Sequence, residues 1–499
     1  MRRDIEQLKA NHFDILIIGG GINGCAIARD AALRGAKLAL IEKEDFASGA
    51  SGKTTKLIHG GIRYLEQFNF KLVCESLRER AVLLKQAPHL VKPLEFIIPV
   101  YKHDPRSLLK IRTGVFIYDR LAGGNNIRPH RSLKKHEVLS LEQNIDSLNL
   151  KGGVLYCDAQ MDDIRLCLDN AISAYDTGAS LSNKTEAIGF IKEKGRIIGI
   201  EARDKLTGEQ FFIRAGMVIN ATGAWSNRII KLDDPASLDI TRPTKGVHIV
   251  YRRLPHERAI LLSAHKDKRV LFIIPWRGYT LIGSTDTDYA GSADDAYADT
   301  NDVEYLLEEA RRVFGLKNLD RKGIITTFTG LRPLVNTQDK LTWQVSREHL
   351  IKESPSGLIS VVGGKYTTYR HLAEQVVGLA LAKINASTKL SIDGERSRTI
   401  KGRNFKECIT HMVGPSSPVL QKENNDLPNL IEHAVKEEMA NSLIDLLVRR
   451  LQLSITPSHG LEYLKECADI MAALLGWTDT KKEQEINLYK EEVRRNMNF

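Results

Sequence analysis

Cysteine is scarce in this sequence, with six residues among 499, and none of them forms a C-x-x-C pair. This spacing argues against a zinc site and against an iron–sulfur cluster of ordinary ligand spacing. Scattered thiols are typical of proteins that work in a reducing compartment. We therefore predict no metal site.

Long apolar runs are also lacking. No run approaches the length of a membrane span, and the polar start, MRRDIEQLKANHFD, carries no signal-peptide core. We therefore expect a cytoplasmic protein, or one held on a membrane surface without crossing it.

Aromatic residues make up only 6% of the chain and no RNA-binding motif is present, although the formal net charge is +10. Single-stranded nucleic acid is bound by aromatic side chains set in basic grooves, so this composition argues against such a partner. The charge then favours an anionic lipid or a phosphorylated substrate as partner, and a solvated basic surface is the alternative.

The length of 499 residues is too great for one hydrophobic core, so we expect two or three domains. The most informative stretch is FDILIIGGGINGCAIARDAALRGAKLALIEKE, which predicts a buried strand, a helix and a second strand. Between the first strand and the helix lies a G-x-G-x-x-G motif. In this motif Gly19 makes the tight turn, Gly21 lets a pyrophosphate approach the helix N-terminus, and Gly24 permits close packing of helix on strand.

Glu42 closes the second strand and is placed to accept hydrogen bonds from ribose hydroxyls. Its charge would repel a ribose 2′-phosphate, which disfavours NADP. Three features favour FAD over NAD: the motif begins a long chain, a loop rich in Gly, Ser and Thr follows over 49–61, and a later strand ends in the turn Ala221, Thr222 and Gly223.

Three cations lie close to predicted strand ends, where α/β proteins place their sites. They are Arg332 in FTGLRPL, Arg347 in WQVSREHL and Lys365 in SVVGGKYTTYR. These side chains could converge on one dianionic phosphate, because the arginine fork donates hydrogen bonds in pairs. The alternative is that each is a surface or salt-bridged residue.

Seven segments together resemble the FAD-dependent glycerol-3-phosphate dehydrogenases of the D-amino-acid-oxidase-like flavoprotein superfamily. They are GGGINGCAIARDAALRG, KLIHGGIRYLE, NATGAW, TKGVHIV, IGSTDTDY, GLRPL and VVGGKYTTYR. The resemblance runs from about residue 13 to residue 385 and persists more weakly to the end of the chain. One departure is Arg449-Arg450-Leu451, where the family usually has threonine after the arginine pair and where no chemistry is assigned.

The resemblance implies an activity, an acceptor and a set of site residues. The enzyme would oxidise sn-glycerol 3-phosphate to dihydroxyacetone phosphate, pass a hydride from C2 to flavin N5, and deliver electrons to a ubiquinone-type membrane quinone. Residues implied to bind the substrate are Arg63, Tyr64, Arg332, Arg347 and Lys365. Residues implied to bind FAD are Gly19, Gly21, Ile22, Asn23, Gly24, Glu42, Lys43, Thr54, Thr55, Lys56, His59, Gly60, Gly61, Ala221, Thr222, Gly223, Gly363, Gly364, Lys365, Thr367 and Thr368.

The base that takes the C2 hydroxyl proton is left between two histidines. His248 is the first candidate, since histidine titrates near the operating pH, and His59 is the second. Arg332 is a candidate for stabilising the developing alkoxide.

The predicted fold is α/β: a Rossmann-like FAD-binding domain, an inserted α+β cap domain and a C-terminal all-α domain. We assign 1–77, 151–230 and 325–390 to the FAD-binding domain, 78–150 and 231–324 to the cap, and 391–499 to the helical domain. The basic, apolar-studded segment 100–135 suits an anionic membrane surface, or else a helix packed on the cap.

Three other functions are alternatives to this prediction. They are an oxidase of the same fold that reduces oxygen, an FAD-bearing nucleic-acid-binding protein, and a multi-subunit anaerobic dehydrogenase, which would need clustered cysteines. We therefore predict no nucleic-acid partner and a peripheral location on the cytoplasmic side of the inner or plasma membrane. The sequence leaves the oligomeric state open, with a homodimer as one option.

Overall fold

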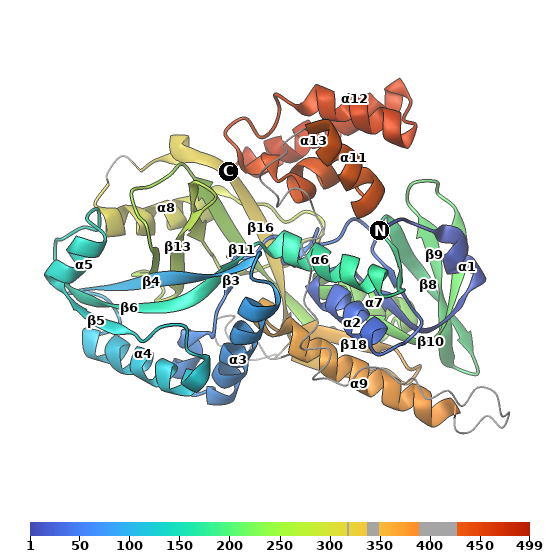
Figure 1. The fold of residues 1–499 in the computed structure, drawn as a ribbon, viewed down its shortest axis with the longest axis horizontal. Coiled ribbons are helices and arrows are strands. Elements are labelled where there is room, and N and C mark those ends of the chain that lie inside the picture. Colours follow the sequence, from blue (N-terminus) through green and yellow to red (C-terminus); the bar gives the residue numbers. More distant parts are fainter. Residues whose placement is uncertain (317–318, 337–348, 389–426) are drawn as a thin grey trace.

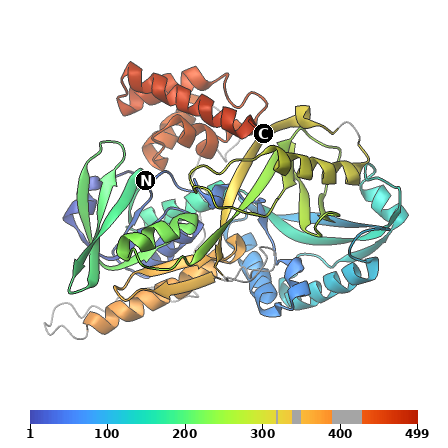
Figure 2. The ribbon, with the colours of Figure 1, turned by 180° about the vertical axis from the view of Figure 1, so that it is seen from behind.

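The computed structural model describes residues 1–316, 319–336, 349–388 and 427–499 of the chain (Figure 1). In this part of the chain two large sheets lie side by side, and a group of helices from the C-terminal end lies against both. The view from behind shows the same arrangement (Figure 2).

The first sheet carries the dinucleotide motif. Its strand order is β17-β18-β10-β1-β2-β7, with a β8–β9 pair attached to β10. β1 pairs in parallel with β2 and β10, and β10 with β18. The strands are β1 (His12–Ile18), β2 (Leu38–Ile41), β7 (Ser180–Ser182), β8 (Thr185–Glu193), β9 (Arg196–Asp204), β10 (Gln210–Asn220), β17 (His349–Glu353) and β18 (Ile359–Gly363).

Three helices pack together beside this sheet: α2 (Ile22–Leu33), α6 (Asp163–Asp176) and α9 (Tyr369–Thr388). Alanines on α2 allow close packing against α6, and their side chains share one core with Ile15 and Ile17 of β1. The predicted strand–helix–strand unit is confirmed, and Gly35 follows the helix end with a φ of 85°. The shorter helices α1 (Ile5–Ala10) and α7 (Ser226–Asp233) contact β10 and β18 respectively.

The second sheet has ten strands in the order β15-β11-β14-β13-β12-β4-β6-β3, with β16 paired to β11 and β5 to β6. The strands are β3 (Leu57–Ile58), β4 (Val91–Tyr101), β5 (Arg131–Lys134), β6 (Leu150–Met161), β11 (Thr241–Tyr251), β12 (Ala259–Ser263), β13 (Val270–Trp276), β14 (Tyr279–Gly283), β15 (Thr287–Asp288) and β16 (Ile324–Val335). One core joins this sheet to α3 (Phe70–Gln86) and α4 (Leu108–Ala122), and another joins it to α5 (Lys135–Leu141) and α8 (Thr300–Phe314).

The predicted domain boundaries do not coincide with the division between the two sheets. β3, most of β6 and most of β16 lie within ranges assigned to the FAD-binding domain, yet all three are hydrogen-bonded strands of the second sheet. The sequence of an apolar strand does not indicate which of two sheets the strand joins, because that depends on pairing with strands distant in the sequence. The domain division itself stays a prediction.

The described C-terminal part is helical, as predicted. It contains α11 (Leu427–Glu438), a π-helical turn (Asp445–Arg450), α12 (Leu464–Leu475) and α13 (Asp479–Met497). Between α11 and the π-helical turn the chain changes direction at Met439, whose φ is 56°. Thr478 caps α13, and its side chain accepts a hydrogen bond from the amide of Lys481.

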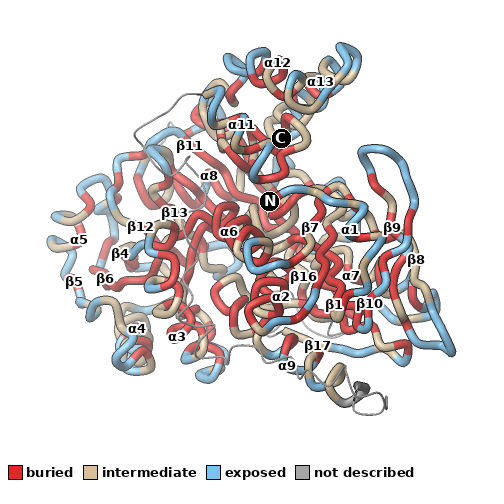
Figure 3. Tube along the Cα trace, turned by 45° about the vertical axis from the view of Figure 1, so that its right-hand side comes forward, coloured by how far each residue is buried: buried red, intermediate tan, exposed pale blue. Residues whose placement is uncertain are grey.

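Burial follows this architecture. The strands of both sheets and α2 are mostly buried, whereas α4, α12 and α13 each have one exposed face (Figure 3). None of the helices within the described ranges combines the length and the apolar character that a membrane crossing requires.

Candidate functional site

A cavity of about 810 Å³ lies between the two sheets. It begins at the motif after β1, passes the ends of β2 and β10, and continues to β11, β16 and the turn after β18. The cavity therefore joins the predicted nucleotide site to the predicted substrate site.

The motif after β1 is built as the sequence predicts. Gly19 has a φ of 111°, and a Cβ on Gly24 would lie 1.9 Å from the carbonyl oxygen of Gly19, so helix and turn touch directly. Gly21 is the N-cap of α2 and offers no side-chain cap. Ser51 instead reaches the helix start and accepts a hydrogen bond from the amide of Ile22 at 2.9 Å. The helix N-terminus faces the cavity, which suits a pyrophosphate.

Glu42 lines the cavity and also fixes the motif. Its carboxylate accepts hydrogen bonds from the amides of Gly20, at 2.7 Å, and Glu44, at 2.8 Å. Burial raises the pKa of this carboxyl, and the two amide donors oppose the rise. Each carboxylate oxygen can accept a further hydrogen bond, so Glu42 can still bind a ribose hydroxyl.

A bridge that the sequence does not reveal crosses the nucleotide end of the cavity. Asp294, beyond β15 of the second sheet, accepts hydrogen bonds from Lys43 at 2.6 Å and from the indole of Trp225 at 2.9 Å. The Lys43 ammonium also lies 4.7 Å from the Trp225 ring centroid. Trp225 stands in the NATGAW motif, which is the only sequence signal of this contact.

At the other end of the cavity, Arg332 is held by two side chains. It donates hydrogen bonds to Ser284 at 2.6 Å and to Asp286 at 3.1 Å. Its guanidinium lies over Gly246, where a Cβ would come within 2.3 Å of Nη2. Burial lowers the pKa of Arg332 and Asp286 opposes that effect.

His248 is buried beside this arginine. Its Nε2 lies 2.9 Å from Thr55 Oγ1, and its ring stacks on Phe328 at 4.9 Å. Burial, together with the positive charges of Arg332 and Lys56, holds the pKa of His248 well below its usual value. The imidazole is therefore neutral at neutral pH, and its lowered pKa makes it a weaker base than the sequence prediction assumes, because a catalytic base works best when its pKa lies near the operating pH.

Arg63, Tyr64 and Lys365 form one contact group at the same end. The guanidinium of Arg63 donates to the Tyr64 hydroxyl at 3.0 Å, and the Lys365 ammonium lies 3.8 Å from the Tyr64 ring centroid. Lys365 also donates to Ser76 of α3 at 3.0 Å. Gly61, with a φ of 77°, makes room for this group, since a Cβ there would lie 2.5 Å from the Tyr64 ring.

The turn 59–61 lies against the turn after β18. The amide of His59 donates to Thr367 Oγ1 at 3.1 Å, and this hydroxyl also lies 3.2 Å from the His59 carbonyl oxygen. Two segments about 300 residues apart are thus joined at the cavity wall.

Most of the predicted site residues line the cavity. These are Gly19, Gly21, Ile22, Asn23, Glu42, Lys43, Thr54, Thr55, His59, Gly61, Arg63, Tyr64, Ala221, Thr222, Gly223, His248, Arg332, Gly363, Gly364, Lys365 and Thr367. Their roles in binding stay predictions.

Four predicted residues, Gly24, Lys56, Gly60 and Thr368, do not line the cavity. The Lys56 ammonium is buried and lies 2.6 Å from the Asp163 carboxylate, and this geometry argues against a direct contact with the cofactor. The amide of Gly60 faces Asp158 at 3.3 Å. The hydroxyl of Thr368 lies 3.4 Å from the carbonyl oxygen of Lys365. A fifth, Arg347, lies outside the described residues.

The residues present fit FAD. An open helix N-terminus suits the pyrophosphate, a carboxylate stands where the ribose is expected, and the cavity extends well beyond the nucleotide motif toward the second sheet. That extension provides room for a bulky ring system.

Comparison with known proteins agrees with this geometry. The family model of FAD dependent oxidoreductases matches residues 14–370, and the C-terminal domain of alpha-glycerophosphate oxidase matches residues 402–482. A glycerol-3-phosphate dehydrogenase from Synechocystis sp. is 35% identical, over 99% of this chain and 98% of its own. An aerobic glycerol-3-phosphate dehydrogenase from Staphylococcus saprophyticus is 32% identical, over 96% of this chain and 94% of its own.

Solved structures show the same architecture. The glycerol-3-phosphate dehydrogenase from Bacillus halodurans complexed with FAD aligns with a TM-score of 0.77 at 26% identity, over 99% of this chain and 97% of its own. The L-alpha-glycerophosphate oxidase from Mycoplasma pneumoniae shares the fold, with a TM-score of 0.59 at 17% identity, over 75% of this chain and 95% of its own. The chain therefore belongs to the FAD-dependent oxidoreductase family, within the group of glycerol-3-phosphate dehydrogenases, and its cofactor is FAD.

Proposed function

We propose that the protein oxidises sn-glycerol 3-phosphate to dihydroxyacetone phosphate. The observation that carries the proposal is that Arg63 and Lys365, which both contact Tyr64, line the same end of the cofactor cavity as Arg332. Two arginines and a lysine suit a phosphate dianion, because arginine donates in pairs and lysine adds a point charge. The names of the relatives agree with this substrate.

FAD, when bound, supplies the acceptor for the two electrons of the breaking C2–H bond. The chain's own residues have the other tasks. The three cations bind the phosphate and fix the orientation of C2, and Arg332 also favours negative charge on the C2 oxygen as its proton leaves. His248, neutral and hydrogen-bonded to Thr55 at 2.9 Å, is the first candidate to take that proton, and His59 is the second.

Anaerobic mixing with sn-glycerol 3-phosphate tests the substrate. We expect the flavin absorbance near roughly 450 nm to bleach promptly. Arg332→Ala should keep FAD and bleach at least about a hundredfold more slowly, since a misplaced substrate loses oriented attack. Arg242→Ala is the matched control, because Arg242 lies on the neighbouring strand and pairs with the exposed Asp288 outside the cavity. Unchanged bleaching in the Arg332 variant would remove this arginine from the site.

We further propose a ubiquinone-type quinone as electron acceptor and a membrane surface as its source. Support comes from apolar side chains that stand exposed on neighbouring elements: Phe68, which precedes α3, is 79% exposed, and Leu109 and Phe116 of α4 are 75% and 47% exposed. The exposed cations Lys110 and Arg120 belong to the same helix. Exposed apolar side chains with cations on the same helix suit an anionic bilayer surface. The inner face of α4 packs against the second sheet through Val115 and Tyr118, which agrees with the alternative prediction of a packed helix and leaves the outer face for a membrane.

Sedimentation with vesicles of anionic phospholipid tests the surface. The double variant Phe68→Gln with Leu109→Gln should bind several-fold less than the parent protein. Leu238→Gln is the matched control, since Leu238 is equally exposed, at 80%, on another part of the chain. Reoxidation of the reduced protein separates the acceptors: rapid recovery of absorbance with a soluble ubiquinone and slow recovery with oxygen supports the dehydrogenase, and the reverse result supports the oxidase.

A further inference from the structure

The arginine pair Arg449 and Arg450 has no role in the chemistry above. Both belong to the π-helical turn of the C-terminal part, and both are buried. Their guanidinium groups meet one carboxylate, that of Asp45, with contacts of 2.6 Å from Arg449 and of 2.8 and 3.0 Å from Arg450. Asp45 lies in the loop that directly follows β2.

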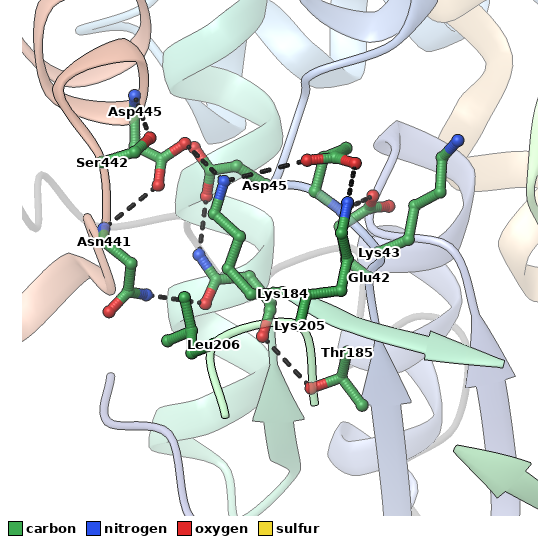
Figure 4. A network of polar contacts seen from close by, with 12 residues as sticks. Glu42, Lys43, Asp45, Lys184, Thr185, Lys205, Leu206, Asn441, Ser442 and Asp445 are labelled. Atoms are coloured by element: carbon green, nitrogen blue, oxygen red, sulfur yellow. Dashed lines mark hydrogen bonds and ion pairs between the residues drawn. The ribbon is translucent and has the colours of Figure 1, made fainter. Parts of the chain in front are cut away.

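Further contacts attach the same loop to the C-terminal part. Asn183 donates to Asp45 at 3.0 Å and to the carbonyl of Met439 at 2.8 Å, and Asn441 donates to Asn183 at 3.0 Å. Lys184 lies 3.1 Å from Asp445 (Figure 4). The arginines hold the pKa of Asp45 well below its usual range, so the carboxylate stays charged.

The other side of this loop faces the cofactor cavity. Three residues before Asp45, Glu42 holds the amide of Gly20 in the nucleotide motif. Two residues after it, the amide of Ala47 donates to the Gly20 carbonyl at 3.1 Å. The loop is therefore held between the motif on one side and the buried arginines on the other.

From this arrangement we propose that Asp45, Arg449 and Arg450 are positioning residues for the FAD site. Through them the C-terminal part of the chain fixes the loop that carries Glu42 and so slows the release of FAD. The physical reason is preorganisation: a loop already held in its binding conformation has less freedom to lose when the cofactor binds. The inference rests on the FAD site alone and not on the identity of the substrate.

FAD release from the purified holoprotein tests this inference. After strong dilution, the rise of flavin fluorescence gives the release rate. Asp45→Asn, which keeps the shape of the side chain and removes its charge, should release FAD at least about tenfold faster. Arg450→Lys keeps the charge but loses the forked geometry, and should give an intermediate rate.

Gln452→Leu is the matched control. Gln452 also joins the C-terminal part to the rest of the chain, by contacts of 3.1 and 3.2 Å to Asp162, but it does not contact the loop 42–46. Release from this variant should stay within about twofold of the parent rate. Equal acceleration in Gln452→Leu and Asp45→Asn would overturn the inference, because general loosening of the C-terminal part would then explain both.

The melting temperature is a second measurement, which separates a loss of FAD affinity from a general loss of stability in the variants. A loss of FAD affinity makes the melting-temperature deficit of Asp45→Asn, relative to the parent protein, grow as FAD is added to the apoproteins, because a ligand stabilises the folded state less when its dissociation constant is larger. A purely structural defect would leave the deficit the same at every FAD concentration, and that result would also overturn the inference.

Discussion

At the scale of single residues, the cap end of the site depends on glycines that leave space for large side chains. Gly246 lies under the Arg332 guanidinium and Gly283 lies under the imidazole of His248. Both positions are in strands, β11 and β14, that pair with each other, so the two side chains are seated on one stretch of sheet. The positions of Arg332 and His248 thus depend on the absence of a side chain at Gly246 and Gly283.

Gly283→Ala should therefore displace His248. The added Cβ would lie 2.2 Å from Cδ2 of the ring, a distance that forces the imidazole to move. We expect FAD to be retained and turnover to fall about tenfold or more, because small displacements of reacting groups are costly. Steady-state turnover and flavin content measure this. Gly124→Ala, where no atom lies within 4 Å of the added Cβ, is the control, and equal turnover in both variants would contradict the prediction.

In the nucleotide motif, substitutions at two glycines should distinguish loss of cofactor binding from loss of stability. A Cβ on Gly21 would meet only Ser51 Oγ, at 3.2 Å, so Gly21→Val should still fold but should lack flavin, because the side chain blocks the pyrophosphate. Gly24→Ala should also lose stability, since its Cβ would lie 1.9 Å from a backbone oxygen. Absorbance spectra and thermal melting compare the two. A Gly21→Val protein with full flavin content would show that this glycine is not needed for cofactor approach.

At the scale of elements, the connection between β11 and β12 carries a buried histidine. His256 donates from Nδ1 to the carbonyl of Arg258 at 2.9 Å, and its Nε2 lies 3.0 Å from Thr280 Oγ1 of β14. Burial lowers the pKa of His256 to about 4. The neutral ring is thus part of the attachment of this connection to the sheet.

Acid should weaken that attachment. Well above pH 6.5 the histidine is neutral in both the folded and the unfolded chain, so it adds no pH dependence there. As the pH falls from about 6.5 to about 4, the unfolded chain binds a proton that the folded chain does not, and the free energy of unfolding falls by about 3 kcal/mol. Urea unfolding at several pH values measures the slope.

In the variant His256→Gln, the free energy of unfolding should depend less steeply on pH, by the uptake of about one proton on unfolding. Other titrating groups remain in the variant, so their contributions cancel when it is compared with the parent protein. His12→Gln, at an exposed position, is the matched substitution. A His256→Gln protein with the parent slope would place the acid sensitivity elsewhere.

At the scale of the whole molecule, the C-terminal helices are joined to the nucleotide-binding part by buried ion pairs. Besides the contacts to Asp45, Arg165 of α6 lies 2.7 Å from Glu438 at the end of α11, and both side chains are almost fully buried. A buried charge whose partner is removed costs far more than an exposed one.

Glu438→Ala should therefore lower the free energy of unfolding by about 3 kcal/mol or more, because Arg165 loses a buried partner. Glu432→Ala is the matched control: it lies on the same helix, its side chain is 48% exposed, and loss of its surface pair with Lys436 should cost at most about 1 kcal/mol. Urea denaturation compares them, and equal costs for the two glutamates would contradict the buried-pair argument.

Much of the nucleotide half could be predicted from the sequence. β1, α2, β2, β10 and β18 are where their patterns predict them, because each signal is local: glycines at fixed spacing, an apolar run, a turn at the strand end. The helical tail was also predicted, although its break at Met439 was not. A non-glycine residue with a positive φ does not change the spacing of apolar residues, so the sequence pattern does not indicate the break.

Other features carry no local signal. Lys56 stands in a motif loop, yet it is turned to Asp163, and Asp294 reaches across the cavity to Lys43 and Trp225. These contacts join residues far apart in the chain, and a single sequence does not show which distant residues lie close together in the fold.

By itself, the sequence determined the cofactor class, the family and the types of residue available to the site, because motif spacing and residue chemistry are properties of short segments. Only the tertiary structure decided which cations meet around Tyr64, how glycines seat His248 and Arg332, and that a distant arginine pair lies behind the FAD loop. The physical reason is that strand pairing and burial are decided by the whole chain at once. Asp45 is a charged loop residue in the sequence, and only the fold places two buried arginines against it.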